Sequence, residues 1–198
     1  MEINKKHNNS QSGFALLMTL IVVGVILSIG LSVLELSIKQ IKLATNARDS
    51  EIAFHAANAG MECSRYWRRT NALQMETGVA IDPTCFGVTA SPPTVLGGPV
   101  PGITGNGEAF QYDYEFTWGT GLNTRCTEIT TLVASSTLPG AGLTINNMTT
   151  IIPGYPSGNS KFCEAGTRCT VISVRGYNRP CSGTSNYGTV QREVLLQF

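Results

Sequence analysis

Residues 13–34 read GFALLMTLIVVGVILSIGLSVL, and this stretch decides how the rest of the chain is organised. No charged residue occurs from Phe14 to Leu34, and the first charge after the stretch is Glu35. At a rise of about 1.5 Å per residue, a helix of this length crosses a hydrocarbon core of roughly 30 Å. The sequence therefore predicts one membrane-spanning helix, and nothing later in the chain is comparably apolar.

The stretch follows a short polar leader, MEINKKHNNSQS, which carries Lys5 and Lys6. Basic residues are held on the cytoplasmic side of a membrane helix, so the leader is expected to stay there. Lys39 and Lys42 on the far flank weaken that charge bias. A conventional secretory signal has an apolar core of about 7–15 residues followed by a small-residue cleavage site. The apolar run here is longer and continues into a helical pattern, which favours an anchor.

Small residues form a stripe within the apolar run. Gly24, Ser28 and Ser32 are four residues apart, so they share one face of a helix. Small residues on one face let another helix approach closely in a membrane. They are also frequent in membrane helices in general, so both helix–helix assembly and plain lipid exposure fit the stripe.

The helical pattern continues well beyond the apolar run, because the first proline in the chain is Pro83. We expect a helix from Phe14 to about Trp67, on the order of 80 Å long. Its second half is amphipathic, with one apolar stripe that needs a surface such as a sheet. The stripe consists of Ile52, Ala56, Ala59, Cys63 and Tyr66.

Charge excludes one class of function. The formal net charge is +1, and charged residues make up only 14% of the chain. A nucleic-acid-binding surface needs a surplus of Lys and Arg to neutralise phosphates, so no nucleic-acid partner is predicted. A mild basic cluster at Arg65, Arg68 and Arg69 is expected to form a solvated helix face.

The chain contains six cysteines, and all of them follow the apolar run. They are Cys63, Cys85, Cys126, Cys163, Cys169 and Cys181. An even number behind a membrane segment favours an oxidising compartment and up to three disulfides, with 15 possible pairings. Zinc sites need closely spaced Cys or His ligands, and the chain has no CxxC pair, so no metal site is predicted. Cys63, on the apolar stripe, is expected to face the domain and bond to a cysteine there.

Beyond the helix the composition becomes rich in Gly, Pro, Thr and Val from about Thr77 to Gly107, which indicates loop. Alternation with a period of two then predicts strands. The expected strands are Phe110–Trp118, Thr127–Ser136, a short one within Leu143–Ile152, Cys169–Tyr177 and Thr189–Phe198. Hairpin-like connections favour an antiparallel sheet. The predicted class is α+β, with a long helix packed on a disulfide-stabilised antiparallel sheet.

The strand at residues 110–118 has aromatic residues on one face and polar residues on the other. The aromatic face is expected to be buried core instead of a ligand platform. Asp113 and Glu115 share the polar face, where solvent exposure explains them better than paired-carboxylate catalysis. No nucleophile elbow, HExxH motif or phosphate loop is present, so neither enzymatic activity nor a cofactor is predicted.

The residues around Gly13 resemble the N-terminus of type IV pilins and of type II secretion pseudopilins. In that family a dedicated prepilin peptidase cuts after the Gly that ends the basic leader, and the new N-terminal Phe is usually N-methylated. The resemblance places the cut between Gly13 and Phe14. Residues 53–62, AFHAANAGME, are similar to the AFxAAEAGxE segment of PilX-type minor pilins and K-type minor pseudopilins, with Asn58 where Glu is common. The resemblance covers roughly residues 5–62 and implies a pilin-like fold.

One position departs from the family pattern. Major pilins carry Glu at the fifth residue after the cut, which is thought to pair with the N-terminal amine of the subunit ahead. Here that residue is Met18. A buried amine without a carboxylate partner is costly. The departure therefore implies a minor subunit at or near the filament tip, or one that primes assembly.

The resemblance also implies an organisation and a set of partners. We expect a cytoplasmic leader at residues 1–13, a transmembrane and assembly half of the helix at 14–34, its amphipathic half at 35–72, and an extracytoplasmic β-rich domain at 73–198. The implied partners are other pilin or pseudopilin subunits, the inner-membrane assembly machinery, prepilin peptidase and membrane lipid. A minor pseudopilin of a type II secretion system and a membrane-anchored adhesin are the alternatives.

Overall fold

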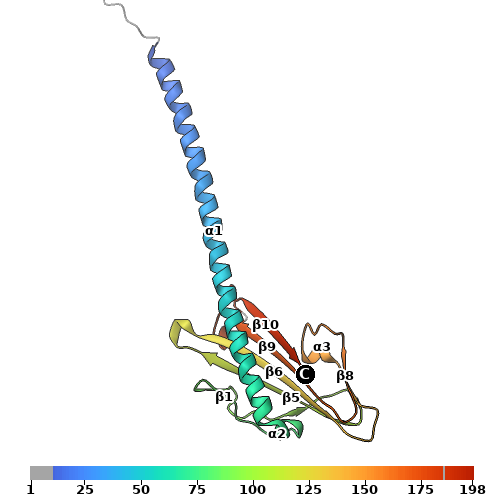
Figure 1. Ribbon diagram of the computed structural model, residues 1–198. Coiled ribbons are helices and arrows are strands. Elements are labelled where there is room, and N and C mark those ends of the chain that lie inside the picture. Colours follow the sequence, from blue (N-terminus) through green and yellow to red (C-terminus); the bar gives the residue numbers. More distant parts are fainter. Residues whose placement is uncertain (1–10, 185) are drawn as a thin grey trace, which may run out of the picture. The chain divides into compact units, whose positions relative to one another are not determined.

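The structure is a computed structural model that describes residues 11–184 and 186–198 (Figure 1). Most of the predicted leader, residues 1–10, lies outside the described residues. The first element is a single long helix, α1 (Gln11–Thr70), which confirms the helix predicted from Phe14 to about Trp67. The chain divides into two compact units between Ala47 and Arg48, so this boundary falls within α1.

After α1 the chain is α+β with antiparallel sheets, as predicted. The remaining helical elements are α2 (Ala72–Glu76), η1 (Gly121–Asn123), α3 (Met148–Ile151) and η2 (Cys181–Gly183). The strands are β1 (Thr84–Cys85), β2 (Val88–Thr89), β3 (Gly98–Pro99), β4 (Ile103–Gly105), β5 (Gly107–Trp118), β6 (Arg125–Ser136), β7 (Leu143–Asn146), β8 (Ser160–Cys163), β9 (Arg168–Tyr177) and β10 (Gln191–Gln197). The prediction of loop for residues 77–107 was therefore wrong in part, because the short strands β1 to β4 form within this region.

The main sheet has the strand order β10-β9-β6-β5-β3. The predicted strands at residues 110–118, 127–136, 169–177 and 189–198 are its four long members, all paired antiparallel. The C-terminal part of α1 lies across one face of this sheet (Figure 1). The predicted short strand within Leu143–Ile152 is β7, in a separate sheet of order β4-β7-β8.

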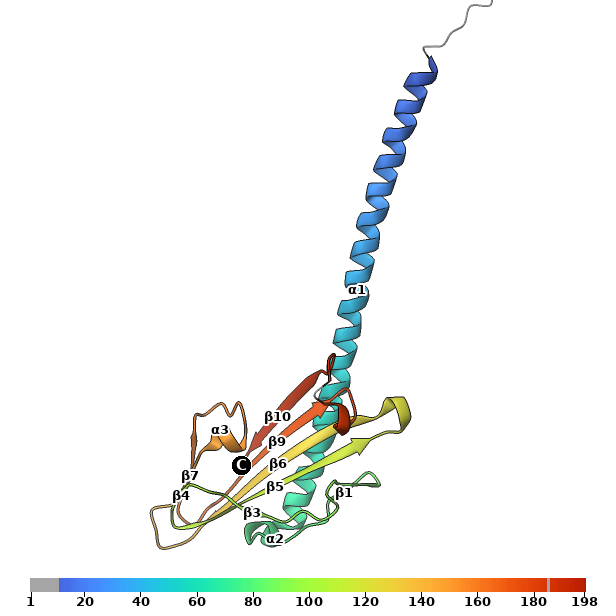
Figure 2. The ribbon, with the colours of Figure 1, turned by 180° about the vertical axis from the view of Figure 1, so that it is seen from behind.

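Two apolar cores lie on the two faces of the main sheet. The core beneath α1 contains the aromatic face of β5, with Tyr112 and Phe116 fully buried, as predicted. The second core lies on the opposite face at one end of the strands, where Leu132 and Val171 pack against β7 and α3. The rest of that opposite face is not part of either core, and it faces the viewer in Figure 2.

Helix α1 meets the sheet mainly through small residues, and this buried face shares only Ala56 and Cys63 with the predicted apolar stripe. Ala53, Ala57 and Gly60 are buried, whereas Tyr66, predicted to be buried, is 61% exposed. A Cβ atom added to Gly176 on β9 would lie 2.1 Å from the carbonyl oxygen of Ala53. Close backbone approach therefore selects which face is buried, so the true stripe is rotated from the one that hydropathy indicated.

Arg68 corrects a second expectation, that it would form part of a solvated basic face. It is only 6% exposed, and its guanidinium lies 2.9 Å from the carboxylate of Glu76, which is also buried. It also donates to the hydroxyl of Thr170 at 2.9 Å. A buried charge needs a charged partner and hydrogen bonds, and Arg68 has both because α2 turns Glu76 back toward α1. Arg69 is exposed, as expected.

All six cysteines form disulfides, as the cysteine count favoured. The pairs, which the sequence left open, are Cys63–Cys85, Cys126–Cys181 and Cys163–Cys169. Cys63 does face the sheet domain and bonds to a cysteine there. Each pair joins neighbouring segments: α1 to β1, β6 to η2, and β8 to β9.

Candidate functional site

The first candidate site is the apolar half of α1. Every side chain from residue 13 to residue 47 is exposed, including the whole apolar run. By length and composition, α1 is a candidate membrane span among the described residues. An exposed apolar helix surface of this size is unfavourable in water, and it fits contact with lipid or with other helices.

The small residues Gly24, Ser28 and Ser32 lie on this uncovered surface, and a Cβ at Gly24 would meet no atom within 4 Å. The serine hydroxyls are already used within the helix. Ser28 donates to the carbonyl of Val25 at 2.8 Å, and Ser32 donates to that of Ser28 at 2.9 Å. These bonds leave no hydroxyl donor unsatisfied in an apolar environment. The stripe therefore presents a narrow surface that either lipid or a second helix can cover.

Gly13 and Phe14 lie in the first turns of α1, and both are exposed. A peptidase needs an accessible peptide bond, and the end of a helix frays at small cost. Gly13 lowers that cost by about 1 kcal/mol relative to Ala. The peptide bond between Gly13 and Phe14 is therefore accessible. Met18 lies on the same exposed surface as Phe14 and, being a thioether, offers no carboxylate to an amine.

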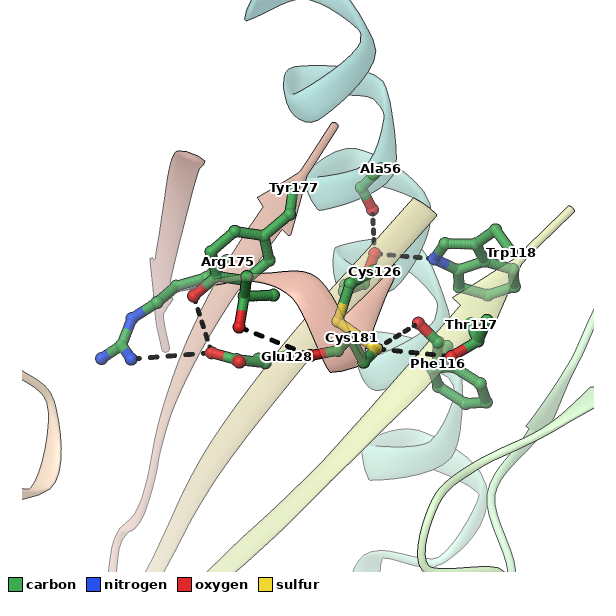
Figure 3. Close-up of a disulfide and its surroundings, with 11 residues drawn as sticks. Ala56, Phe116, Thr117, Trp118, Cys126, Glu128, Arg175, Tyr177 and Cys181 are labelled. Atoms are coloured by element: carbon green, nitrogen blue, oxygen red, sulfur yellow. Dashed lines mark hydrogen bonds and ion pairs between the residues drawn. A yellow bond between two sulfur atoms is a disulfide. The ribbon is translucent and has the colours of Figure 1, made fainter. Parts of the chain in front are cut away.

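The disulfide Cys126–Cys181 is the centre of a second cluster (Figure 3). Cys126, Cys181 and Glu115 lie close enough together to resemble a metal site. Both sulfur atoms are bonded to each other, however, and the thiolates that would ligate a metal do not exist in this state. Next to the disulfide, the Trp118 indole donates to Thr127, whose hydroxyl donates to the carbonyl of Ala56, which joins the sheet to α1.

Beside this disulfide lies a row of charged residues on the face of the sheet that α1 does not cover. Glu115 on β5 faces Glu128 on β6, and Glu128 faces Arg175 on β9. The hydroxyl of Tyr177 donates to Glu128 at 2.8 Å, while Arg175 is 3.9 Å from it. Burial, and then the charge of Glu128, raises the pKa of Glu115 above its ordinary value. Burial and the bond to Glu128 also raise the pKa of Tyr177.

A hollow of about 480 Å³ borders this row, lined among others by Asp113, Glu115 and Glu128. Asp113 is exposed, as predicted for the polar face, and accepts hydrogen bonds from Gln111 and Thr130. The pair that lies directly opposite across the strands is Glu115 with Glu128, not Asp113 with Glu115.

A groove between α1 and the β1–β2 hairpin is the feature that the sequence did not reveal. It has a volume of about 240 Å³ and is lined by Glu62, Cys63, Tyr66, Thr84, Cys85 and Phe86. Two aromatic rings form its exposed walls. The signal in the sequence was the Phe86-Gly87 pair between two strand-like dipeptides, but Phe is unusual at a turn position that favours Asn.

Comparisons with protein-family models, with curated proteins and with solved structures find no match to this chain.

Proposed function

We propose that this chain is a minor pilin of a type IV pilus, placed at the tip or used to prime assembly. Prepilin peptidase cuts it between Gly13 and Phe14. The apolar half of α1 first holds it in the inner membrane, with the β-rich domain on the extracytoplasmic side. The assembly machinery then moves the subunit into an extracellular filament, where helices of other pilin subunits replace lipid around α1.

One observation carries this proposal, which is the exposure of α1 from residue 13 to residue 47. A membrane anchor alone needs about 20 apolar residues and no particular junction. Here the apolar run begins directly after a Gly-Phe junction and continues as one helix into a domain that packs on its last turns. An assembly helix has to be uncovered within its own subunit.

The experiment that tests processing is mass spectrometry of the mature protein from its native membrane. We expect an N-terminal methyl-Phe14 and a mass that corresponds to three disulfides without reductant. An intact leader, or a cut near Ala59, would contradict the proposal. The Phe14→Ala variant should still be exported if the helix acts only as an anchor, but its N-terminal methylation should change.

The place of the subunit in the filament is tested by stoichiometry. Because Met18 cannot pair with an amine ahead of it, we expect only a few copies per purified filament. If this chain were the dominant subunit, the tip assignment would be wrong. Loss of the chain should reduce piliation. Loss of protein secretion with intact pili would instead favour the alternative, a minor pseudopilin of a type II secretion system.

A membrane-anchored binding module is the second candidate function, and one observation favours it. Phe86, Leu96 and Leu138 are exposed on the loops of the β-rich domain. Exposed large apolar side chains on loops are typical of binding surfaces. The chain would then remain in the membrane with its leader processed or intact, and purified filaments would lack it.

A further inference from the structure

We propose that the groove between α1 and the β1–β2 hairpin binds a cationic side chain, arginine or lysine, of a partner polypeptide. This inference goes beyond the proposed function, and it holds whether or not the chain is assembled into a filament. Three features of the groove support it: its exposed aromatic walls, the conformation of Phe86, and a carboxylate at its rim.

The aromatic walls are held in place without a ligand. The Cys63–Cys85 disulfide joins the two sides of the groove, and the Trp67 indole donates to the carbonyl of Thr84 at 3.2 Å. The ring of Phe86 meets the ring of Trp118 edge-on, with centroids 6.0 Å apart. Trp118 in turn stacks on the buried ring of Phe116. A site whose walls are already ordered loses little conformational freedom when it binds.

Phe86 is unfavourable where it stands, both in its backbone and in its side chain. Its φ is +52°, a left-handed conformation that Gly, Asn and Asp adopt more readily. The next residue, Gly87, has a φ of +78°, so the two form the centre of a tight hairpin turn in which Asn-Gly is favoured. The ring is also 78% exposed. Such a residue in such a place points to a contact made outside the chain.

The charge of the groove indicates which kind of chemical group makes that contact. Glu62 is the one charged residue among the six that line the groove. Its partner in the chain is Arg65, at 2.9 Å, in a pair that is exposed on both sides. Exposed pairs of this kind are held weakly, so an incoming cation can share or replace the interaction. The faces of Tyr, Phe and Trp rings attract cations, and a carboxylate beside them adds directional hydrogen bonds for a guanidinium.

Binding is tested on the full chain in detergent micelles. The probe is N-acetyl-arginine methylamide, and its control is the citrulline analogue, which has the same shape without the charge. The chain has two tryptophans, and both flank the hairpin, so their indole N–H signals in NMR spectra report on the groove. We expect the arginine probe to shift these signals with at least tenfold higher affinity than the citrulline probe. Equal responses would overturn the proposal.

Variants separate binding from folding. Phe86→Asn introduces a residue that suits the turn, so it should leave the thermal midpoint of unfolding unchanged or raise it. The same variant should lower the affinity for the arginine probe at least tenfold. Tyr66→Ala, at an exposed position, should also weaken the probe, and Glu62→Gln should remove the preference for arginine over citrulline. Tyr187→Ala removes an exposed ring elsewhere and should change nothing.

The proposal is wrong if Phe86→Asn and Tyr66→Ala both bind the arginine probe as the unmodified chain does. It is also wrong if a neutral methyl glucoside shifts the indole signals while the arginine probe does not, since the groove would then be a saccharide platform. Because these measurements do not use filaments or membranes, their failure is distinguishable from failure of the proposed pilin function.

Discussion

The two halves of α1 belong to one helix but are opposite in composition and in environment. Residues 13–47 carry large aliphatic side chains, and all of them are exposed. Between residues 53 and 68 the buried positions are mostly small or polar, with Ala53, Ala57 and Gly60 against the sheet. Hydropathy is therefore highest where the chain itself buries nothing. The apolar half is suited to being covered by groups outside the chain, and the packed half is suited to close contact with one sheet.

The largest effect is expected where the packed half touches the sheet. In Gly176→Leu, the new side chain would meet the backbone of Ala53 and Ala57, which cannot move aside like a flexible side chain. We expect a loss of at least about 3 kcal/mol in the free energy of unfolding, enough to prevent folding. The matched variant Gly24→Leu meets nothing within 4 Å and should leave the domain intact. Urea unfolding in detergent, followed by circular dichroism, measures both.

The contrast would fail if Gly24→Leu lowered the stability of the domain as Gly176→Leu does. Gly24→Leu is informative in a second way. If the small-residue stripe is a contact between helices in the filament, this variant should reduce assembly while folding is unaffected. Normal assembly of a folded Gly24→Leu chain would show that lipid or loose packing covers the stripe.

The disulfide that anchors the packed half is expected to give the next largest effect. Cys63 and Cys85 are separated by 22 residues, and replacing both by Ala should cost about 3 kcal/mol in the chain-entropy treatment of loop closure. The Cys163–Cys169 pair closes a loop of only six residues, so its removal should cost about 2 kcal/mol. Thermal unfolding of the two double variants, under non-reducing conditions, compares them. An inverted order would contradict the entropic explanation.

The sequence was sufficient for features that repeat along the chain. The apolar run and the alternation at residues 110–118 are visible because hydropathy follows the period of the helix or of the strand. The length of α1 followed from the absence of proline before Pro83. These patterns predicted α1, the four long strands of the antiparallel main sheet and the uncovered half of α1, which is the main part of the candidate site.

The sequence was insufficient for features that depend on which segments meet. The buried face of α1 keeps Ala56 and Cys63 of the predicted stripe but is rotated from the rest of it, because the close approach to Gly176 selects small residues that carry little hydropathy signal. Arg68 is buried because Glu76 returns to it after the helix ends, and no local pattern reveals that return. The disulfide pairing and the groove at Phe86 likewise depend on contacts between α1 and a hairpin about twenty residues further on.

Arg68, at the far end of the packed half, is expected to show a smaller effect than the disulfide. In Arg68→Met, Glu76 loses its buried partner but keeps Arg168, which lies 3.0 Å away and is mostly exposed. Removing one member of a fully buried pair costs about 3–5 kcal/mol, and the remaining arginine should reduce this to about 2 kcal/mol. Urea unfolding measures the loss.

Two controls make the result for Arg68 specific. Arg65→Met breaks an exposed pair with Glu62 and should cost less than about 0.5 kcal/mol. The double variant Arg68→Met with Glu76→Leu removes both charges, and it should recover most of the stability that the single variant lost. If the single variant were as stable as the unmodified chain, the ion pair would not hold α2 against α1.

The smallest effect is expected on the sheet face that α1 does not cover, where Glu115 faces Glu128. Like charges directly opposite across strands are destabilising, so Glu115→Gln should raise the free energy of unfolding by about 0.5 kcal/mol at neutral pH. Because the pKa of Glu115 is raised in the folded state, that state binds its proton more tightly than the unfolded chain does. The advantage of Gln should therefore shrink as the pH falls through the raised pKa, and vanish once Glu115 is protonated in both states.

Asp113→Asn is the control, because it weakens the bonds from Gln111 and Thr130 and should give no such gain. Urea unfolding from pH 7 to pH 4 measures both variants, and a gain for Gln that grows as the pH falls would contradict the sign of this linkage.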